Sequence, residues 1–334
     1  MAGSVKLKDI ASELGVSVVT VSNALSGKKG VSESVREEIL KTAERMGYDT
    51  SKYGRKDGES IKIGVIVSEK YLEVGTSFYW AMYQQVAYEA SRKNGFTIFE
   101  ILDRNTNGKS ELPKVLTGEE IDGLLVIGWM EHQYIRRVLA AARVPVVLLD
   151  FYDEEFSCDA VMSNNYIGMY KATRYLLERG HQEIAFVGTL EANNNIMDRF
   201  YGFRKGMEEW GARIRSEWVI SDRDVESNEV RFELPENMPT AFVCNSDFTA
   251  GILYDKLREK GYRIPEDISV TAYDNYLYGH PFANELTTYN VDMGLMAKTA
   301  VHILLKKIRK QDRHQGVRYI DSEMIERSSV KSCI

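Results

Sequence analysis

The chain has 334 residues, of which 44% are hydrophobic and 28% are charged, and its formal net charge is −6 at pH 7. Its length allows about two domains of roughly 150 residues each, and it contains no run of 18 apolar residues, which excludes a membrane helix and a membrane partner. The first ten residues lack the apolar stretch of a secretory signal, so we expect a cytoplasmic protein.

Charge is distributed unevenly along the chain. Residues 1–56 contain 10 Lys and Arg against 7 Asp and Glu, whereas the remaining residues contain 33 against 42. A slightly basic head on an acidic body is compatible with a small DNA-binding unit attached to a larger domain.

The first 48 residues predict three short helices. The segment VKLKDIASELG has its apolar residues at helical spacing and reaches Gly15, which is typical of a helix end. Ser17 is expected to cap a second helix, and Ser32 a third helix that closes at Gly47. Two helices joined by a tight turn are typical of a helix-turn-helix unit, although any small three-helix unit has a similar pattern.

The predicted second helix, in the segment SVVTVSNAL, carries two valines outside its apolar stripe. Val21, Ala24 and Leu25 form that stripe, so Val18 and Val19 lie on the opposite face. A solvated face normally carries charged or amide side chains. The two valines therefore predict contact with an apolar group outside the head.

Residues 49–60 are polar and charged, which predicts a linker, and an α/β pattern begins at residue 61. Strands are expected over 61–67, 96–102, 122–128, 145–150, 160–164, 183–188, 240–245 and 268–275. Buried strands that alternate with helices predict parallel sheets with right-handed crossovers. About eight such units exceed one sheet, so we expect two α/β lobes with a ligand beyond the carboxyl ends of their strands.

Motifs of common catalytic and cofactor sites are absent from the sequence. It has no GxGxxG after the first strand, no GxxxxGK[ST], no HExxH and no GxSxG. Cys158, Cys244 and Cys333 lie far apart, and we expect buried free thiols rather than disulfides or a metal site. The sequence thus predicts no enzyme, no cofactor and no metal, although a carboxylate pair at strand ends leaves a sugar-modifying enzyme as an alternative.

A series of motifs extends from residue 5 to residue 329. It begins with VKLKDIASELGVSVVTVSNALSGKKGVSESVREEILKTAERMGY and continues through DGLLVIG, VPVVLLD, ERGHQEIAFVG, DRFYGF, PTAFVCNSD, IPEDISVTAYDN and ELTTYN to MIERSS. In content and order these motifs resemble the lactose-repressor/galactose-repressor (LacI/GalR) family of bacterial transcription regulators.

The resemblance implies a helix-turn-helix DNA-binding domain over 1–48, a hinge over 49–60 and an effector-binding core over 61–334. The core is expected to resemble periplasmic binding proteins. Its lobe 1 would contain about 61–162 and 291–319, and its lobe 2 about 163–290 and 320–334. The implied partners are double-stranded operator DNA, a small sugar effector and a second copy of the chain, in a homodimer or a tetramer.

Positions that match Val18, Val19 and Asn23 face base edges in the family. A valine cannot form a hydrogen bond but can pack on a thymine methyl group, so the resemblance implies a reader of T·A-rich steps, with Asn23 available for an adenine. The alternative is that one valine only packs against the first helix. The other implied contacts hold phosphates and position the head: Lys6, Ser17, Thr20, Ser22, Ser26, Lys28, Lys29, Ser32 and, in the linker, Arg55.

The linker departs from the family pattern. Family members carry Ala-Arg and then a leucine that wedges into the minor groove, whereas this chain has Gly54-Arg55 and Asp57. Glycine disfavours a helix by about 1 kcal/mol relative to alanine, and a carboxylate beside phosphates cannot intercalate. We expect a solvated linker, with Tyr53 as the alternative wedge.

The effector site implied by the resemblance lies at strand and helix ends. Arg199, in DRFYGF, matches the family's pocket arginine, and Asp274, in AYDN, matches its acidic ligand residue. Carboxylates and one arginine suit sugar hydroxyls, and aromatic rings suit the C–H face of a sugar, so a neutral saccharide is favoured over a phosphate or a purine. The remaining implied residues are Phe78, Tyr79, Trp129, Asp150, Phe151, Asn164, Asn195, Ser246 and Asp247.

These observations predict a repressor of a carbohydrate-utilisation operon that responds to a sugar. Effector binding would favour one arrangement of the lobes and change the spacing of two heads on the operator. Two other functions remain open at this point: a sugar-binding sensor without DNA affinity, and a sugar-modifying enzyme.

Overall fold

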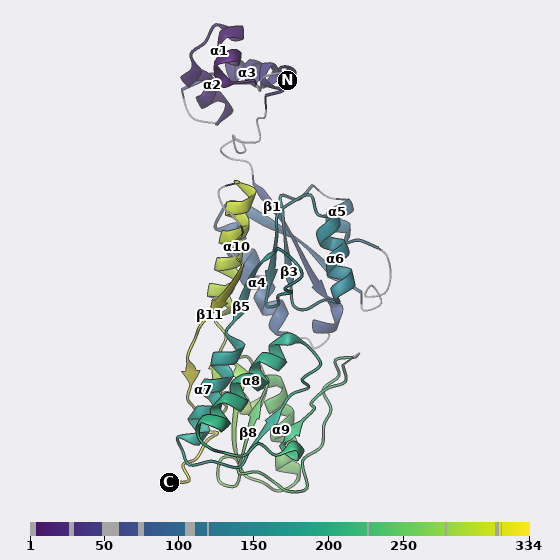
Figure 1. The fold of residues 1–334 in the computed structure, drawn as a ribbon, viewed down its shortest axis with the longest axis vertical. Coiled ribbons are helices and arrows are strands. Elements are labelled where there is room, and N and C mark those ends of the chain that lie inside the picture. The colour runs from purple at the N-terminus through teal and green to yellow at the C-terminus, as the bar shows by residue number, and fades with distance from the viewer. Residues whose placement is uncertain are drawn as a thin grey trace.

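A computed structural model shows a helical head followed by two α/β lobes (Figure 1). Among the residues that the structure describes, no helix is both long and apolar enough to cross a lipid bilayer. The described residues are 5–26, 30–48, 60–72, 77–103, 111–118, 120–225, 227–277, 279–310, 314 and 316–334.

The head contains α1 (Leu7–Leu14), α2 (Val18–Leu25) and α3 (Glu33–Arg45). Gly15 follows α1 with a φ of 63°, and the Ser17 hydroxyl accepts a hydrogen bond from the first turn of α2, as predicted. Ser32 precedes α3, but its side chain accepts no hydrogen bond from a backbone amide of the first turn and bonds the hydroxyl of Ser34 instead, so the predicted cap is wrong in this detail. Ile10, Val21 and Ile39 are fully buried and form the centre of a small core.

Lobe 1 is built on a parallel sheet with the strand order β11-β5-β4-β3-β1-β2. Helices α4 (Phe78–Ser91) and α10 (Met293–Ile308) cover one face, and α5 (Lys114–Thr117) and α6 (His132–Ala141) cover the other (Figure 1). The strands are β1 (Ile61–Ser68), β2 (Gly95–Leu102), β3 (Gly123–Ile127), β4 (Val146–Leu149), β5 (Asp159–Ser163) and β11 (Val317–Ile320). Because both faces are covered, β1, β3 and β4 are almost wholly buried.

Lobe 2 repeats this plan with the strand order β12-β10-β9-β8-β6-β7, in which only β12 pairs antiparallel. Helices α7 (Asn165–Leu177) and α8 (Asn194–Glu209) cover one face, and α9 (Asp247–Glu259) covers the other. The strands are β6 (Ile184–Val187), β7 (Val219–Ile220), β8 (Ala241–Cys244), β9 (Ser269–Asp274), β10 (Thr287–Asn290) and β12 (Met324–Ile325). The predicted α/β class, with a three-helix head and two parallel sheets, is confirmed.

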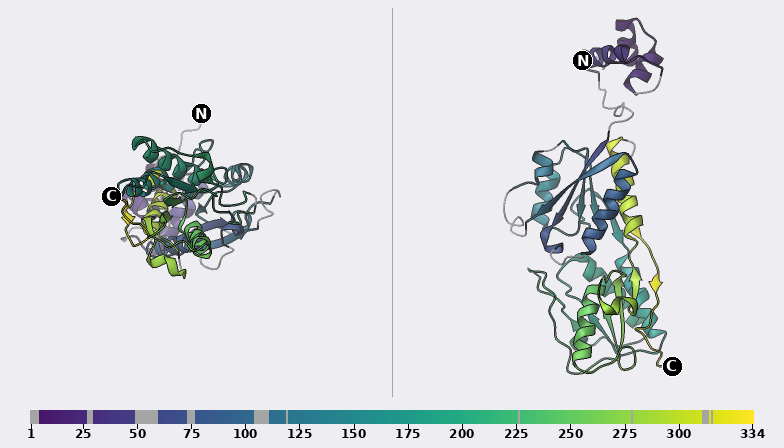
Figure 2. Two further views of the ribbon diagram at one scale, coloured as in Figure 1. Left: turned by 90° about the horizontal axis from the view of Figure 1, so that it is seen from below. Right: turned by 180° about the vertical axis from the view of Figure 1, so that it is seen from behind.

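The chain passes between the lobes three times: after β5, after β10 and after β11 (Figures 1 and 2). Side chains tie the crossing segments together. Asn164 donates to Asp321 at 2.6 Å, and Asn290 donates to the hydroxyl of Ser322 at 2.9 Å. The carboxyl ends of β4 and β9 face the same junction, because Asp150 and Asp274 line one cavity there.

The three cysteines differ in exposure. Cys244 is buried and Cys158 is partly buried, but Cys333, near the end of the chain, is exposed. The prediction of buried thiols is therefore wrong for Cys333, because the final segment lies on the surface of lobe 2.

Candidate functional site

The outer face of α2 carries two exposed valines. The side chains of Val18 and Val19 are 45% and 68% exposed, whereas Val21, Ala24 and Leu25 on the same helix are buried. Packing inside the head therefore does not explain Val19. An apolar pair in this position is available to another molecule.

The other head residues predicted to contact DNA differ in what they already bond. The hydroxyl of Ser17 lies 2.8 Å from that of Thr20 and also accepts the Thr20 amide. The Ser26 hydroxyl donates to the carbonyl of Ser22 at 2.6 Å, so it is engaged within α2. Lys6 and Ser32 are exposed, and Ser22 and Asn23 are half-buried. Lys28, Lys29 and Arg55 lie outside the described residues.

A cavity of about 740 Å³ lies between the two lobes. This volume is within the range of small-molecule sites, about 300–1,000 Å³. Residues from both lobes line it, and they include these predicted effector-binding residues: Phe78, Tyr79, Asp150, Asn195, Arg199, Ser246 and Asp274.

Asp150 connects the lobes at the floor of this cavity. It follows β4 with a φ of 65°, a conformation that aspartate adopts more readily than most residues. Its Oδ2 atom accepts the hydroxyl of Tyr79 in lobe 1 at 2.9 Å and the amide of Asn195 in lobe 2 at 3.2 Å. Within the described part of the chain, its buried Oδ1 atom has no hydrogen-bond partner. Burial outweighs the attraction of Arg199 and raises the pKa of Asp150 to about 6.

Arg199 is held by lobe 2 from several sides. Its Nε donates to Asn165 at 2.8 Å, its Nη1 donates to the carbonyl of Asn245 at 2.6 Å, and its guanidinium lies 3.9 Å from the ring centre of Tyr273. Its Nη2 is 3.6 Å from the carboxylate of Asp274. Burial nevertheless holds the pKa of Asp274 well above its usual value, because the guanidinium offsets only part of the desolvation.

Close packing of α8 on α7 sets the position of Arg199. A side chain at Gly202 would place its Cβ 2.1 Å from the backbone oxygen of Tyr166, so only glycine allows this approach. Asn195 lies in the first turn of the same helix, one turn before Arg199. Asn195 and Arg199 therefore project into the cavity from a helix whose distance from α7 depends on Gly202.

Aromatic rings form one wall of the cavity. Ser77 caps α4, and the next two residues, Phe78 and Tyr79, have ring centres 5.3 Å apart. The Tyr79 ring also lies 4.8 Å from that of Tyr71, and the Phe78 ring lies 6.1 Å from that of Tyr276 in lobe 2. Rings beside carboxylates can cover an apolar face of a ligand while its polar groups are bound.

Four predicted effector-binding residues do not line this cavity: Trp129, Phe151, Asn164 and Asp247. Phe151 is 3% exposed in the core of lobe 1, and Trp129 packs against the same core. Asp247 is buried beneath the cavity, where it accepts the hydroxyl of Thr288. Phe151 and Asp247 are kept from the cavity because their neighbours Asp150 and Ser246 take the positions that face the space.

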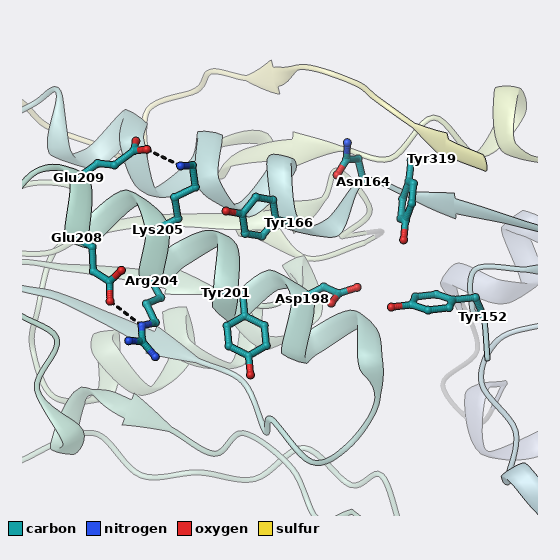
Figure 3. A pocket seen from close by; sticks show the side chains of 10 residues that line it. All are labelled: Tyr152, Asn164, Tyr166, Asp198, Tyr201, Arg204, Lys205, Glu208, Glu209 and Tyr319. Atoms are coloured by element: carbon teal, nitrogen blue, oxygen red, sulfur yellow. Dashed lines mark hydrogen bonds and ion pairs between the residues drawn. The ribbon is translucent and has the colours of Figure 1, made fainter. Parts of the chain in front are cut away.

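Asn164 instead lines a groove on the outside of the lobe junction, shown in Figure 3. Its Oδ1 atom caps α7 and its amide binds Asp321. The groove shares no lining residue with the cavity. Tyr152 and Tyr319 of lobe 1 face Asp198 of α8 across it (Figure 3).

Several cavity residues were not among those predicted. They include Tyr71, Arg223, Asn245, Tyr276 and His280. Arg223 makes the expectation of one arginine in the cleft wrong. It comes from the polar stretch 221–229, which has no apolar periodicity, so the sequence contains no pattern that would assign it to the site.

Models of known protein families match both the head and the core of this chain. A model for bacterial regulatory proteins of the lacI family matches residues 6–51, and a model for a periplasmic binding protein-like domain matches residues 173–330. The HTH-type transcriptional repressor PurR of Vibrio atlanticus (strain LGP32) is 30% identical over 98% of this chain and 98% of its own length. The matched relatives are regulators, in agreement with the prediction that the chain is not an enzyme.

Solved structures share the fold. A complex of the transcriptional regulator CelR with cellobiose has a TM-score of 0.67 and 21% identity, and it covers 97% of this chain and 99% of its own. A lac repressor dimer bound to operator and the anti-inducer ONPF has a TM-score of 0.66 and 20% identity, covering 99% and 100%.

Replacing Val19 with alanine tests whether this side chain reads bases. We expect V19A to lose about 1–3 kcal/mol on the preferred operator and to discriminate less at one base step, because a thymine methyl loses its partner. Fluorescence anisotropy on operators changed one step at a time measures this. S12A, an exposed change on α1, should bind like the parent. An equal loss on all sequences would assign Val19 to packing.

Replacing Asp150 with asparagine tests how much the burial of its charged form lowers the free energy of unfolding. Its raised pKa means that the folded protein binds the extra proton between about pH 4 and 6, so the parent loses stability as pH rises through this range. D150N avoids this loss, which is at most about 3 kcal/mol. We expect its melting temperature to exceed that of the parent at pH 8, with the difference shrinking toward pH 4. A difference independent of pH would contradict the assignment.

Proposed function

This chain is a DNA-binding transcriptional regulator of the lacI family, and from that membership we propose that it represses a carbohydrate-utilisation operon under the control of a sugar. Residues 1–48 would bind the operator, residues 49–60 would link them to the core, and residues 61–334 would bind the sugar. Binding to operator DNA would place the protein in the bacterial cytoplasm.

The single observation that carries the sugar assignment is the make-up of the cavity between the lobes. Asp150 and Asp274 accept hydrogen bonds, Arg199 donates them, and the rings of Phe78 and Tyr79 lie beside these groups. A saccharide offers neighbouring hydroxyls to the first three and an apolar C–H face to the rings.

A ligand in this cavity can bias the arrangement of the lobes because it touches both. Asp150 belongs to lobe 1, while Arg199 and Asp274 belong to lobe 2. A ligand that binds one arrangement more tightly shifts the population toward it. A coupling of about 1–3 kcal/mol between sugar and operator is sufficient for regulation.

An exposed aromatic face on lobe 1 supports a homodimer. Trp80 and Tyr88 of α4 are 42% and 60% exposed, beside the edge strand β2. The Trp80 ring packs on Tyr83 and Phe99 beneath it, so the face is continuous from helix to strand. Apolar surface of this kind is typical of association sites, and an unpaired edge strand adds to it.

The proposed function is tested by operator binding with and without sugar. The chain should bind DNA from its own promoter in a salt-dependent manner. A panel of mono- and disaccharides should raise its melting temperature, by the equivalent of about 2.7 kcal/mol at 100 times the Kd, and should change operator affinity. We expect F78A to lose the sugar response by about tenfold and to keep operator affinity, because one ring of the wall is removed.

The matched control is F156A, which removes a half-buried phenylalanine outside the cavity. It should respond to sugar like the parent. Binding of sugar without any binding of DNA would instead favour a sensor without DNA affinity, and turnover of a bound sugar would favour an enzyme.

The dimer is tested by placing a charge on the aromatic face. Y88D should shift the chain from dimer to monomer in analytical ultracentrifugation, because a carboxylate would be desolvated in the interface. The matched control is Y201D, which makes the same change at an exposed tyrosine of α8 in lobe 2. A dimer that survives Y88D, or that is lost equally in Y201D, would place the interface elsewhere.

A further inference from the structure

The connection between β7 and β8 departs from the rest of lobe 2. β7 and β8 lie on opposite sides of β6 in a parallel sheet, and such crossovers usually contain a helix. The connections from β6 to β7 and from β8 to β9 contain α8 and α9, but the described part of residues 221–240 contains no helix. Figure 1 shows this connection running along lobe 2 toward lobe 1.

A short hairpin takes the place of the helix. Arg223 and Val230 form an antiparallel bridge, and we call residues 222–225 and 227–231 the cavity hairpin. Farther along the connection, Phe232 is 5% exposed and fills part of the core beneath the sheet. Phe232 therefore packs in the core of lobe 2, whereas the cavity hairpin reaches the cavity.

Asp222 anchors the base of the cavity hairpin. It is fully buried and accepts the amide of Thr189 at 2.9 Å, the side chain of Asn245 at 2.7 Å and the hydroxyl of Thr249 at 2.7 Å. Its carboxylate also pairs with Arg223 at 2.8 Å. Burial alone would raise the pKa of Asp222, but Arg223 and these donors outweigh it and lower the pKa to about 2. The base of the hairpin is thus tied to the ends of β6 and β8 and to α9.

The turn of the cavity hairpin is also held in place. Arg223 donates to the side chain of Asn228 at 3.2 Å, and the amide of Asn228 donates to the carbonyl of Asp224 at 3.0 Å. The amide of Ser227 donates to the carboxylate of Asp224 at 2.7 Å. Arg223, Asn228 and Glu229 all line the cavity from this fixed turn.

The cavity hairpin faces lobe 1 at Tyr71. Burial raises the pKa of the Tyr71 phenol, and the nearby positive charge of Arg223 opposes this rise. The Tyr71 ring continues the aromatic wall from Tyr79, whose hydroxyl binds Asp150. The cavity therefore extends from Asp150, along the aromatic wall, to a second group of polar side chains on the hairpin.

We propose that the cavity hairpin forms a second subsite, so that the effector is a disaccharide or a longer saccharide rather than a monosaccharide. One unit would lie between Asp150 and Arg199, and the next would lie on Tyr71 with its hydroxyls bound by Arg223, Asn228 and Glu229. Arg223 already donates to Asp222, Asn228 and Asn245, and its Nη1 atom carries a second hydrogen that can donate to a ligand. This donor, the Asn228 amide and the Glu229 carboxylate are suited to sugar hydroxyls. This inference rests on the proposed sugar response.

The test compares each monosaccharide with disaccharides that contain it, by isothermal titration calorimetry. The probes are glucose and galactose against maltose, cellobiose and lactose. The variant is N228G/E229A, because glycine keeps the positive φ of 59° at residue 228 and Arg223 remains to pair with Asp222. The control is E236A, an exposed change in the same connection that does not line the cavity. Melting temperatures without ligand verify that each variant is folded.

We expect the parent to bind at least one disaccharide about tenfold more tightly than its monosaccharides. N228G/E229A should lose about tenfold in affinity for that disaccharide and bind the monosaccharides like the parent, and E236A should change neither. Equal affinity of the parent for a monosaccharide and its disaccharide, or unchanged disaccharide binding by the double variant, would overturn the second subsite alone. Failure of every saccharide to bind the folded parent would overturn the proposed sugar response together with it.

Discussion

The buried carboxyl group of Asp150 is the point on which the arrangement of the core depends. One oxygen accepts hydrogen bonds from Tyr79 in lobe 1 and Asn195 in lobe 2, and the other has no partner within the described chain. A buried acceptor without a partner is costly, so a ligand that donates to it gains more than it would in water. That gain requires both lobes to be in place, which links occupancy of the cavity to the arrangement of the lobes.

Two buried aspartates of the core show how donors decide the role of a carboxylate. Asp222 receives three hydrogen bonds and an arginine in direct contact, and its pKa falls to about 2. Asp150 receives fewer donors, and its pKa rises to about 6. The first carboxylate is satisfied by the protein and holds a loop in place. The second is left incompletely satisfied, and this suits it to a ligand.

The head and the core both expose apolar side chains to solvent, but the exposed surfaces differ in size. On α2, two valines remain in water beside a helix face that is fully packed, which is unfavourable unless another surface covers them. On lobe 1, rings of α4 and β2 form a wider face of the kind that a second chain can bury. Both surfaces fit the proposed function, in which two chains would assemble on DNA.

The sequence by itself determined the parts of this protein that depend on local pattern. The helices of the head follow from Gly15, Ser17 and apolar spacing, and strands β1 to β6, β8 and β9 follow from apolar, β-branched runs. The short strands β7, β10, β11 and β12 were not predicted. The resemblance of its motifs to a known family also located Asp150, Arg199 and Asp274, which the fold brings to one cavity. Asp150 and Asp274 lie at the carboxyl ends of β4 and β9, where ligands bind in parallel sheets, and Arg199 lies in the second turn of α8.

Tertiary structure decided which neighbour faces the cavity and which loops reach it. Asp150 lines the space and Phe151 enters the core, because the backbone turns at Asp150 with a positive φ. Likewise Ser246 lines the cavity while Asp247 is buried under Thr288. Arg223 reaches the site from a polar stretch without periodicity, whose base is held where Asp222 accepts hydrogen bonds from Thr189, Asn245 and Thr249. Its position depends on contacts between residues far apart in the chain, and such contacts leave no local pattern in a single sequence.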